Sequence, residues 1–129
     1  MKKRILETAN APAPVGPYSQ AVWYGDMLFA SGQIAIDPSS PTGELVLDTI
    51  EAETHQVLKN IGAILAEGGL DYSHVLKASV FVKDMNQYSR INAVYLEYFG
   101  EDFAPARELV EVANLPKFVN VEISVIAGK

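Results

Sequence analysis

The stretch HVLKASVFVK, residues 74–83, alternates sharply between two kinds of side chain. Leu76, Ala78, Val80 and Val82 form a wholly apolar face, and the opposite, mixed face carries Val75, Lys77, Ser79, Phe81 and Lys83. A period of two with one apolar face is typical of a half-buried β-strand. The stretch therefore predicts a strand that turns one side toward a core.

A hairpin is predicted on the N-terminal side of this strand. Its two strands, residues 19–24 and 27–36, are separated by Gly25-Asp26, which fits a type II′ turn because glycine takes the first central position. On the second strand one predicted face holds Leu28, Ala30, Gly32, Ile34 and Ile36, and the other holds Met27, Phe29, Ser31 and Gln33. Two further strands, rich in Val and Ile, are predicted at about 106–112 and 119–127.

Two helices separate these strands. The first is indicated by apolar residues at helical spacing, namely Ile50, Thr54, Val57, Leu58, Ile61 and Leu65. Asp48 and Glu51 resemble a capping box at its start, and Gly68-Gly69 ends it. The second helix carries Ile91, Val94, Tyr95 and Tyr98 on one stripe, with Asp84 or Asn86 as a candidate N-cap and Gly100 at its end.

The predicted order is strands, helix, strand, helix, strands. This order indicates one α+β domain over residues 1–129, with two helices packed on one face of a single sheet. The other face is half apolar, because Phe29 and Phe81 lie on the mixed sides of their strands. Such a face without helices predicts an oligomer interface, and loops that cover part of it are the alternative.

Composition excludes several classes of protein. The chain has 129 residues, a net charge of -6 and no cysteine, so disulfides, thiolate metal sites and a cysteine nucleophile are absent. An acidic chain repels phosphate backbones, which disfavours nucleic acid as a partner. No window approaches about 18 consecutive apolar residues, so no membrane span is expected. Residues 1–8 lack an apolar signal-peptide core, and we expect a cytoplasmic protein.

The common nucleotide and hydrolase motifs are missing. The chain has no Gly-x-Gly-x-x-Gly, no Walker loop and no Gly-x-Ser-x-Gly elbow. Its two histidines, His55 and His74, lack the spacing of a ligand pair, and we interpret both as surface residues. The sequence therefore predicts neither a metal site nor a bound cofactor.

Two charged residues lie in apolar strands. Arg107 begins the strand at 106–112, and Glu122 stands between Val121 and Ile123. A charge in such a strand is costly to bury without a partner. One interpretation is structural: both side chains point to water at a sheet edge or pair with each other. The other is functional, with Arg107 clamping a substrate carboxylate and Glu122 orienting water.

A set of short motifs in fixed order carries a family resemblance. They are GPYSQA (16–21), SGQI (31–34), VFVKDM (80–85), INAVY (91–95), PAR (105–107), VEVA (110–113), LPK (115–117) and VEI (121–123). Together they cover nearly the whole chain, and the chain resembles the RidA/YjgF family of reactive-intermediate imine deaminases.

The resemblance implies a fold, an activity and a site. The implied fold is the chorismate-mutase-like α+β fold, assembled as a homotrimer with sites between subunits. The implied activity is hydrolysis of 2-aminoacrylate, 2-iminopropanoate and 2-iminobutanoate to 2-oxo acids and ammonia, without metal or cofactor. Arg107 and Glu122 match the family's catalytic residues, and Tyr18, Ser31, Gly32 and Asn92 match residues that line the cleft.

The chain departs from the family just after the arginine, where many members carry small residues or a cysteine and this chain has Glu108 and Leu109. On a strand, Leu109 shares the face of Arg107 while Glu108 points away, so Leu109 is predicted to line and narrow the pocket. The backbone N–H near Gly32 is a further candidate donor to the substrate, because glycine permits close approach.

Two other functions fit the same residues. The first is a regulator that binds 2-oxo acids or amino acids at the arginine pocket without turnover. The second is an RNA-directed translation inhibitor or ribonuclease, which the acidic charge and the absence of a histidine acid–base pair disfavour. Disappearance of 2-aminoacrylate generated in the presence of the protein separates an enzyme from both.

Overall fold

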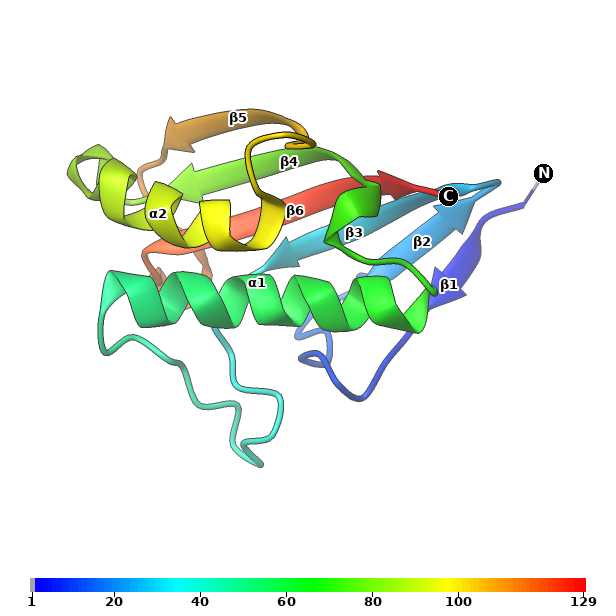
Figure 1. Cartoon of the computed structure of the whole chain (residues 1–129). Helices are drawn as coiled ribbons and strands as arrows, with labels where there is room; N and C mark the ends of the chain where they lie inside the picture. The colour runs from blue at the N-terminus through cyan, green and yellow to red at the C-terminus, as the bar shows by residue number, and fades with distance from the viewer. Residues whose placement is uncertain (1) are drawn as a thin grey trace.

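The computed structural model describes residues 2–129, which form six strands and two helices (Figure 1). The strands are β1 (Arg4–Leu6), β2 (Ala21–Tyr24), β3 (Met27–Gln33), β4 (Val75–Val82), β5 (Ala106–Glu111) and β6 (Val121–Gly128). The helices are α1 (Ile50–Glu67) and α2 (Tyr88–Phe99), and the short 3₁₀ segments are η1 (Tyr72–His74), η2 (Met85–Gln87) and η3 (Pro116–Phe118).

The six strands make one mixed sheet in the order β1-β2-β3-β6-β4-β5. Every neighbouring pair is antiparallel except β4 and β5, which are parallel because the chain returns through α2 between them. Figure 1 shows both helices on the same face of this sheet. The predicted α+β fold with two helices on one face is confirmed. Neither α1 nor α2 is long and apolar enough to cross a bilayer.

Helix α1 supplies much of the core. Its predicted apolar stripe is confirmed, since Val57, Leu58, Ile61 and Leu65 are fully buried. The predicted capping box at Asp48 is wrong: the helix begins at Ile50, and the hydroxyl of Thr49 accepts a hydrogen bond from the Ala52 N–H at 3.0 Å. A cap of this kind stabilises a helix by about 1 kcal/mol. The helix ends at Gly68, as predicted.

The second helix also begins differently from the prediction. The carboxylate of Asp84 caps the short η2 segment by accepting from the Asn86 N–H at 2.9 Å, and neither residue caps α2 itself. Helix α2 ends at Gly100, whose φ of 68° is the left-handed conformation that glycine adopts readily.

A bulge near the end of β3 changes the predicted faces of the residues that follow it. The register between β3 and β6 shifts between Ala30 and Gln33. Leu28 and Ala30 belong to the main core, whereas Ile34 and Ile36 belong to a second, smaller cluster. The prediction of one continuous face is therefore wrong beyond Ala30, because one extra residue in a strand inverts every side chain that follows.

A second irregularity changes the faces at the start of β4. Ala78, Val80 and Val82 are fully buried as predicted, but Leu76 is 52% exposed and Val75 is buried in its place. The register between β4 and β6 shifts between Val75 and Lys77, which exchanges the two faces at this end of the strand.

The face without helices is only partly covered. Phe81 packs against the second cluster, which contains Ile34, Ile36, Leu115 and Val119, so loops and strand ends cover this region. Farther along the sheet Phe29 remains 45% exposed. The oligomer interface stays a prediction for this exposed part.

Candidate active site

Arg107 lies on the helix side of β5, at the edge of the sheet. Strand register pairs it with Ala78 of β4, and Leu109 with Val80, so both side chains share the face that α2 covers. Leu109 is partly buried against the core, and Glu108 points to the other side, where it pairs with Lys77 at 3.0 Å. The alternation predicted for Leu109 and Glu108 is confirmed.

Three residues of α2 surround the Arg107 guanidinium. Arg107 Nη1 donates to Asn92 Oδ1 at 2.8 Å, and Nη2 donates to the Tyr88 hydroxyl at 3.3 Å. The guanidinium carbon lies 4.7 Å from the centroid of the Tyr95 ring and 5.9 Å from that of Tyr88. We call these four residues together with Leu109 the Arg107 cluster.

The Arg107 cluster contains no acidic residue. None of the ion pairs found within residues 2–129 includes Arg107. Tyr95 is buried beside it, and burial raises the pKa of the Tyr95 hydroxyl, which finds no hydrogen-bond partner within the described chain. A positive charge beside a poorly hydrated aromatic ring, with no acidic partner, is prepared for an external anion.

Glu122 lies on the opposite face of the sheet. It pairs in register with Phe81 on the side away from the helices and lines a cavity of about 350 Å³. Tyr18, Ser31, Gly32 and Lys117 line the same cavity, which we call the Glu122 pocket. Burial raises the pKa of the Glu122 carboxyl above its ordinary value, and this makes the carboxylate a stronger base.

Gly32 makes room for Glu122 itself. A Cβ at this position would lie 2.8 Å from Glu122 Cδ and 2.9 Å from Oε2. The atoms that approach Gly32 in this structure belong to the Glu122 carboxylate, and the backbone N–H near Gly32 stays a predicted donor to the substrate. Any side chain at position 32 would displace Glu122.

The wall of the Glu122 pocket is held by a buried glutamine that sequence reasoning did not single out. Gln20 Oε1 accepts from the Thr8 N–H at 2.7 Å, and its Nε2 donates to the carbonyl of Pro12 at 2.8 Å. Ser31 is fixed nearby, since its hydroxyl donates to the Ser19 carbonyl at 2.6 Å. Gln20 thus ties the N-terminal segment across the strands that carry the pocket.

The predicted site residues form two groups within one chain. Tyr18, Ser31 and Gly32 lie with Glu122, and Asn92 and Leu109 lie with Arg107. The two groups occupy opposite faces, and β4 separates β5 from β6. The structural interpretation in which Arg107 and Glu122 pair with each other is therefore wrong for a single chain.

Sequence reasoning missed Tyr88 and the contact of Tyr95 with Arg107. Tyr88, Asn92 and Tyr95 follow the spacing i, i+4, i+7, which places them on one helix face. The sequence contains this spacing, but it does not show which strand faces the stripe.

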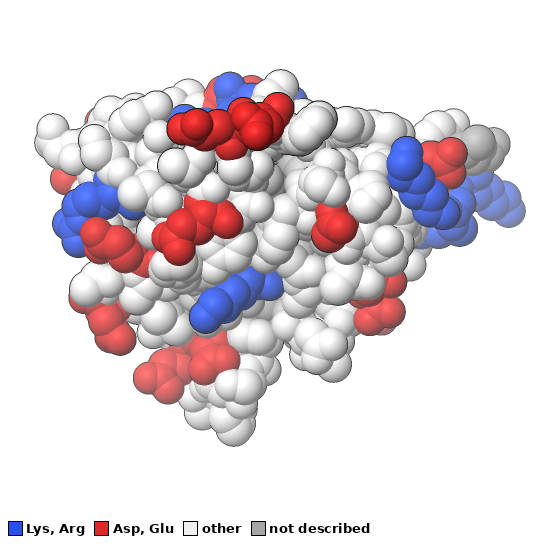
Figure 2. Space-filling model, in the orientation of Figure 1, with Lys and Arg blue, Asp and Glu red and all other residues white. Residues whose placement is uncertain are grey.

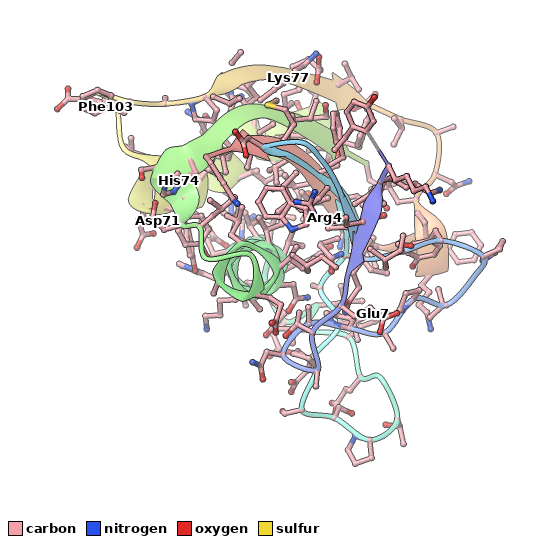
Figure 3. All side chains as sticks on the ribbon, turned by 90° about the vertical axis from the view of Figure 1, so that its right-hand side faces the viewer. Arg4, Glu7, Asp71, His74, Lys77 and Phe103 are labelled. Carbon is pink, nitrogen blue, oxygen red and sulfur yellow. The ribbon has the colours of Figure 1, made fainter. Side chains whose placement is uncertain are left out.

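Both histidines lie outside the two groups. His74 contacts Asp71 at 3.1 Å, and Figure 3 shows the two side chains close together near one end of α1. His55 lies between the helices, where its Nδ1 is 2.9 Å from the Tyr98 hydroxyl. Within residues 2–129 no three His, Asp or Glu side chains are grouped to hold a metal ion. Figure 2 shows acidic side chains spread over the helix-covered face, in keeping with the net charge of -6.

Comparison with known proteins gives close relatives over almost the full length. The family model described as Endoribonuclease L-PSP matches residues 8–129. A RutC family protein from Synechocystis sp. is 50% identical over 98% of this chain and 97% of its own length. A Capra hircus protein named 2-iminobutanoate/2-iminopropanoate deaminase is 47% identical over 97% of this chain and 89% of its own length.

Solved structures share the fold. The YjgF gene product of E. coli is 44% identical with a TM-score of 0.90, and each chain covers 98% of the other. E. coli TdcF with bound serine is 41% identical with the same TM-score and the same coverage. The ordered motifs, the mixed sheet and these matches all agree, and the chain belongs to the RidA/YjgF family, whose sequence model is described as Endoribonuclease L-PSP.

Proposed function

We propose that this protein hydrolyses short imino acids, such as 2-iminopropanoate and 2-iminobutanoate, to 2-oxo acids and ammonia. The observation that carries the proposal is the guanidinium of Arg107, which is held by neutral neighbours and has no acidic partner within residues 2–129. The Capra hircus relative is named for this activity, and the serine bound to TdcF is likewise a short molecule with a carboxylate.

Arg107 binds the substrate carboxylate in this proposal. Asn92 and Tyr88 each accept one hydrogen bond from the guanidinium, which leaves further N–H donors for a ligand. A planar guanidinium forms two parallel, charge-assisted hydrogen bonds to a carboxylate, and these fix orientation as well as position. The clamp also draws electron density from the adjacent imine carbon.

Glu122 activates the water in this proposal. The carboxylate accepts a proton from water while the water oxygen bonds to the imine carbon and the C=N electron pair moves to nitrogen, which takes up a proton. The nitrogen takes this proton from solvent. Protonated Glu122 then returns its proton to the amino group, and the C–N bond breaks as ammonia leaves. The remaining hydroxyl releases its proton to solvent and becomes the carbonyl of the 2-oxo acid, so one water is consumed, Glu122 is regenerated and no electrons are transferred. The raised pKa of Glu122 suits this role, since a stronger base removes the proton more readily.

The proposed hydrolysis needs few catalytic groups besides Arg107 and Glu122. An enamine such as 2-aminoacrylate first tautomerises to the imine, whose carbon is electrophilic and already reacts with water. Positioning together with one general base, which contributes roughly 10²–10⁴-fold, accounts for a useful acceleration. We therefore propose a reaction without metal or cofactor, and prolonged chelation followed by dialysis should leave the rate unchanged.

The separation of the two groups supports a site formed by two copies of the chain. Arg107 and Glu122 lie on opposite faces and two strands apart, so a ligand of a few atoms cannot contact both residues of one chain. If the Arg107 cluster of one copy faces the Glu122 pocket of the next, each copy contributes its Arg107 cluster to one shared site and its Glu122 pocket to another. Such head-to-tail contacts close into a ring, and we propose the homotrimer of the family.

The test generates 2-aminoacrylate in the assay and follows its disappearance with and without the protein. Faster loss with stoichiometric ammonia supports the proposal. Tight binding of 2-oxobutanoate without turnover would instead favour a ligand-binding regulator. RNA cleavage, with binding that weakens steeply as salt rises, would favour the RNA-directed activity that the family description names.

A further inference from the structure

The hydroxyl of Tyr88 lies at a place where it controls the direction of the Arg107 side chain. Arg107 Nη2 donates to this hydroxyl at 3.3 Å, while Nη1 donates to Asn92 Oδ1 at 2.8 Å. Both acceptors belong to α2 and stand one helical turn apart. Two separate atoms of the guanidinium are therefore tied to one rigid element.

A single hydrogen bond leaves a guanidinium free to pivot. With Asn92 alone, the group could still rotate about its Nε–Cζ bond beside the Tyr95 ring, because a ring face attracts the charge without setting this rotation. A second contact at Nη2 removes this freedom. The direction of the remaining N–H groups, and with it the direction of a bound carboxylate, is then set by the helix.

We infer that Tyr88 is a positioning residue, whose hydroxyl fixes the rotation of the Arg107 guanidinium and thereby aligns the carboxylate clamp. The inference rests on the proposed role of Arg107 in binding a carboxylate. The inference also assigns different roles to the ring and to the hydroxyl of Tyr88. The ring, 5.9 Å from the guanidinium carbon, contributes attraction to the charge, and the hydroxyl contributes the angle. Because Tyr88 is 40% exposed, its loss should not disturb the core.

The first experiment measures the guanidinium directly. Nuclear magnetic resonance of ¹⁵N-arginine-labelled protein reports the rotation rate about the Nε–Cζ bond of Arg107. Tyr88→Phe keeps the ring and removes only the hydroxyl, and it should raise this rate roughly 5–30-fold, the effect of one lost hydrogen bond. Tyr98→Phe is the matched control, since it removes a hydroxyl from the same helix that contacts His55 instead; it should leave the rate unchanged. An unchanged rate in Tyr88→Phe overturns the inference.

The second experiment is a double-mutant cycle with Arg107→Lys. Tyr88→Phe should lower kcat/KM roughly 5–30-fold when Arg107 is present and less than about 2-fold in the lysine background, because an ammonium has no plane to align. Equal losses in both backgrounds, or a fall in melting temperature that accounts for the loss, would show that the hydroxyl acts elsewhere and would overturn the inference.

The two experiments also separate this inference from the proposed hydrolysis. If the wild-type protein does not hydrolyse imines, the proposed function fails, whereas the rotation rate still decides whether Tyr88 holds Arg107. In that case the cycle is read from the dissociation constant of 2-oxobutanoate in place of kcat/KM. A wild-type protein that neither hydrolyses imines nor binds 2-oxobutanoate would overturn both.

Discussion

Arg107 is the residue whose shape, and not only its charge, matters in the proposed site. We expect Arg107→Lys to lose roughly 30–150-fold in kcat/KM, nearly as much as Arg107→Ala, because lysine keeps the charge but loses the paired donors. The measurement is imine hydrolysis by wild type and both variants, with the oligomeric state as control. A lysine variant within about threefold of wild type would remove the bidentate clamp. An alanine variant that dissociates into monomers would make Arg107 a structural residue.

The proposed role of Glu122 as a base predicts that kcat depends on pH. A base acts only when ionised, so turnover should fall as pH drops through its pKa. Because burial raises the pKa of this carboxyl above its ordinary value, the acid limb of kcat should lie at a higher pH than that of an exposed glutamate. Glu122→Gln should lower kcat roughly 10²–10³-fold, remove the limb and retain binding of 2-oxobutanoate. The check is a kcat–pH profile together with calorimetry, and a glutamine variant at the wild-type rate would exclude Glu122 as the base.

A substitution at Gly32 tests the role of the Glu122 carboxylate without changing Glu122 itself. Because a Cβ at position 32 would lie only 2.8 Å from Glu122 Cδ, Gly32→Ala must displace the glutamate. We expect its kcat to fall to within about threefold of the Glu122→Gln value. Gly16→Ala is the control, because a Cβ there meets only the Tyr18 ring at an ordinary 3.5 Å. Equal activity of the two alanine variants would contradict the displacement.

At the scale of elements, a buried carboxylate joins α1 to the start of β6. Glu53 is fully buried and accepts from the N–H groups of Asn120 and Val121 at 2.7 and 3.0 Å and from Asn120 Nδ2 at 2.8 Å. These bonds hold the chain at the two residues that directly precede Glu122. The contact therefore links the stability of the helix–strand junction to the placement of the proposed base.

Removal of this carboxylate should be costly. Glu53→Ala leaves the buried N–H of Val121 and the half-buried N–H of Asn120 without this acceptor and should lower the free energy of unfolding by about 2–4 kcal/mol. Glu53→Gln should cost about 1 kcal/mol or less, because its carbonyl oxygen still accepts from both N–H groups and the Asn120 amide can turn to accept from Gln Nε2. Urea unfolding measures both values. Similar losses for the two variants would show that the charge itself is required.

At the scale of the whole molecule, the placement of Arg107 and Glu122 on opposite faces predicts that two inactive variants complement each other when their subunits are mixed. Arg107→Ala and Glu122→Gln should each be nearly inactive alone. After mild unfolding and refolding of an equal mixture, about one quarter of the sites should combine an intact Arg107 from one chain with an intact Glu122 from its neighbour. We expect about one quarter of the wild-type rate, and mixing without subunit exchange is the control.

The assembly itself has an independent measurement. Analytical ultracentrifugation at micromolar concentration should give a species three times the 14.0 kDa chain mass. A 14.0 kDa species alone would contradict the trimer and the shared site together. A trimer without complementation would leave the assembly intact and place the two residues in separate sites.

Local patterns were sufficient for most of the fold. The alternation at 74–83, the helical spacing from Ile50 to Leu65 and the Gly25-Asp26 turn each depend on residues close in sequence, and each predicted its element. Errors arose where neighbouring strands impose register. The bulges in β3 and β4 and the resulting positions of Ile34 and Leu76 depend on pairing with β6, which no local pattern contains.

For the site, the sequence by itself determined the residue types. It contains an arginine and a glutamate in apolar strands, Gly32 in the motif SGQI, and the other ordered motifs of the family. Only the tertiary structure decided how they are grouped. It placed Tyr88, Asn92 and Tyr95 around Arg107, packed Glu122 against Gly32, and put the two groups on opposite faces. The physical reason is that the face of a side chain follows from local alternation, whereas its neighbours follow from strand order and helix packing, which involve residues far apart in the chain.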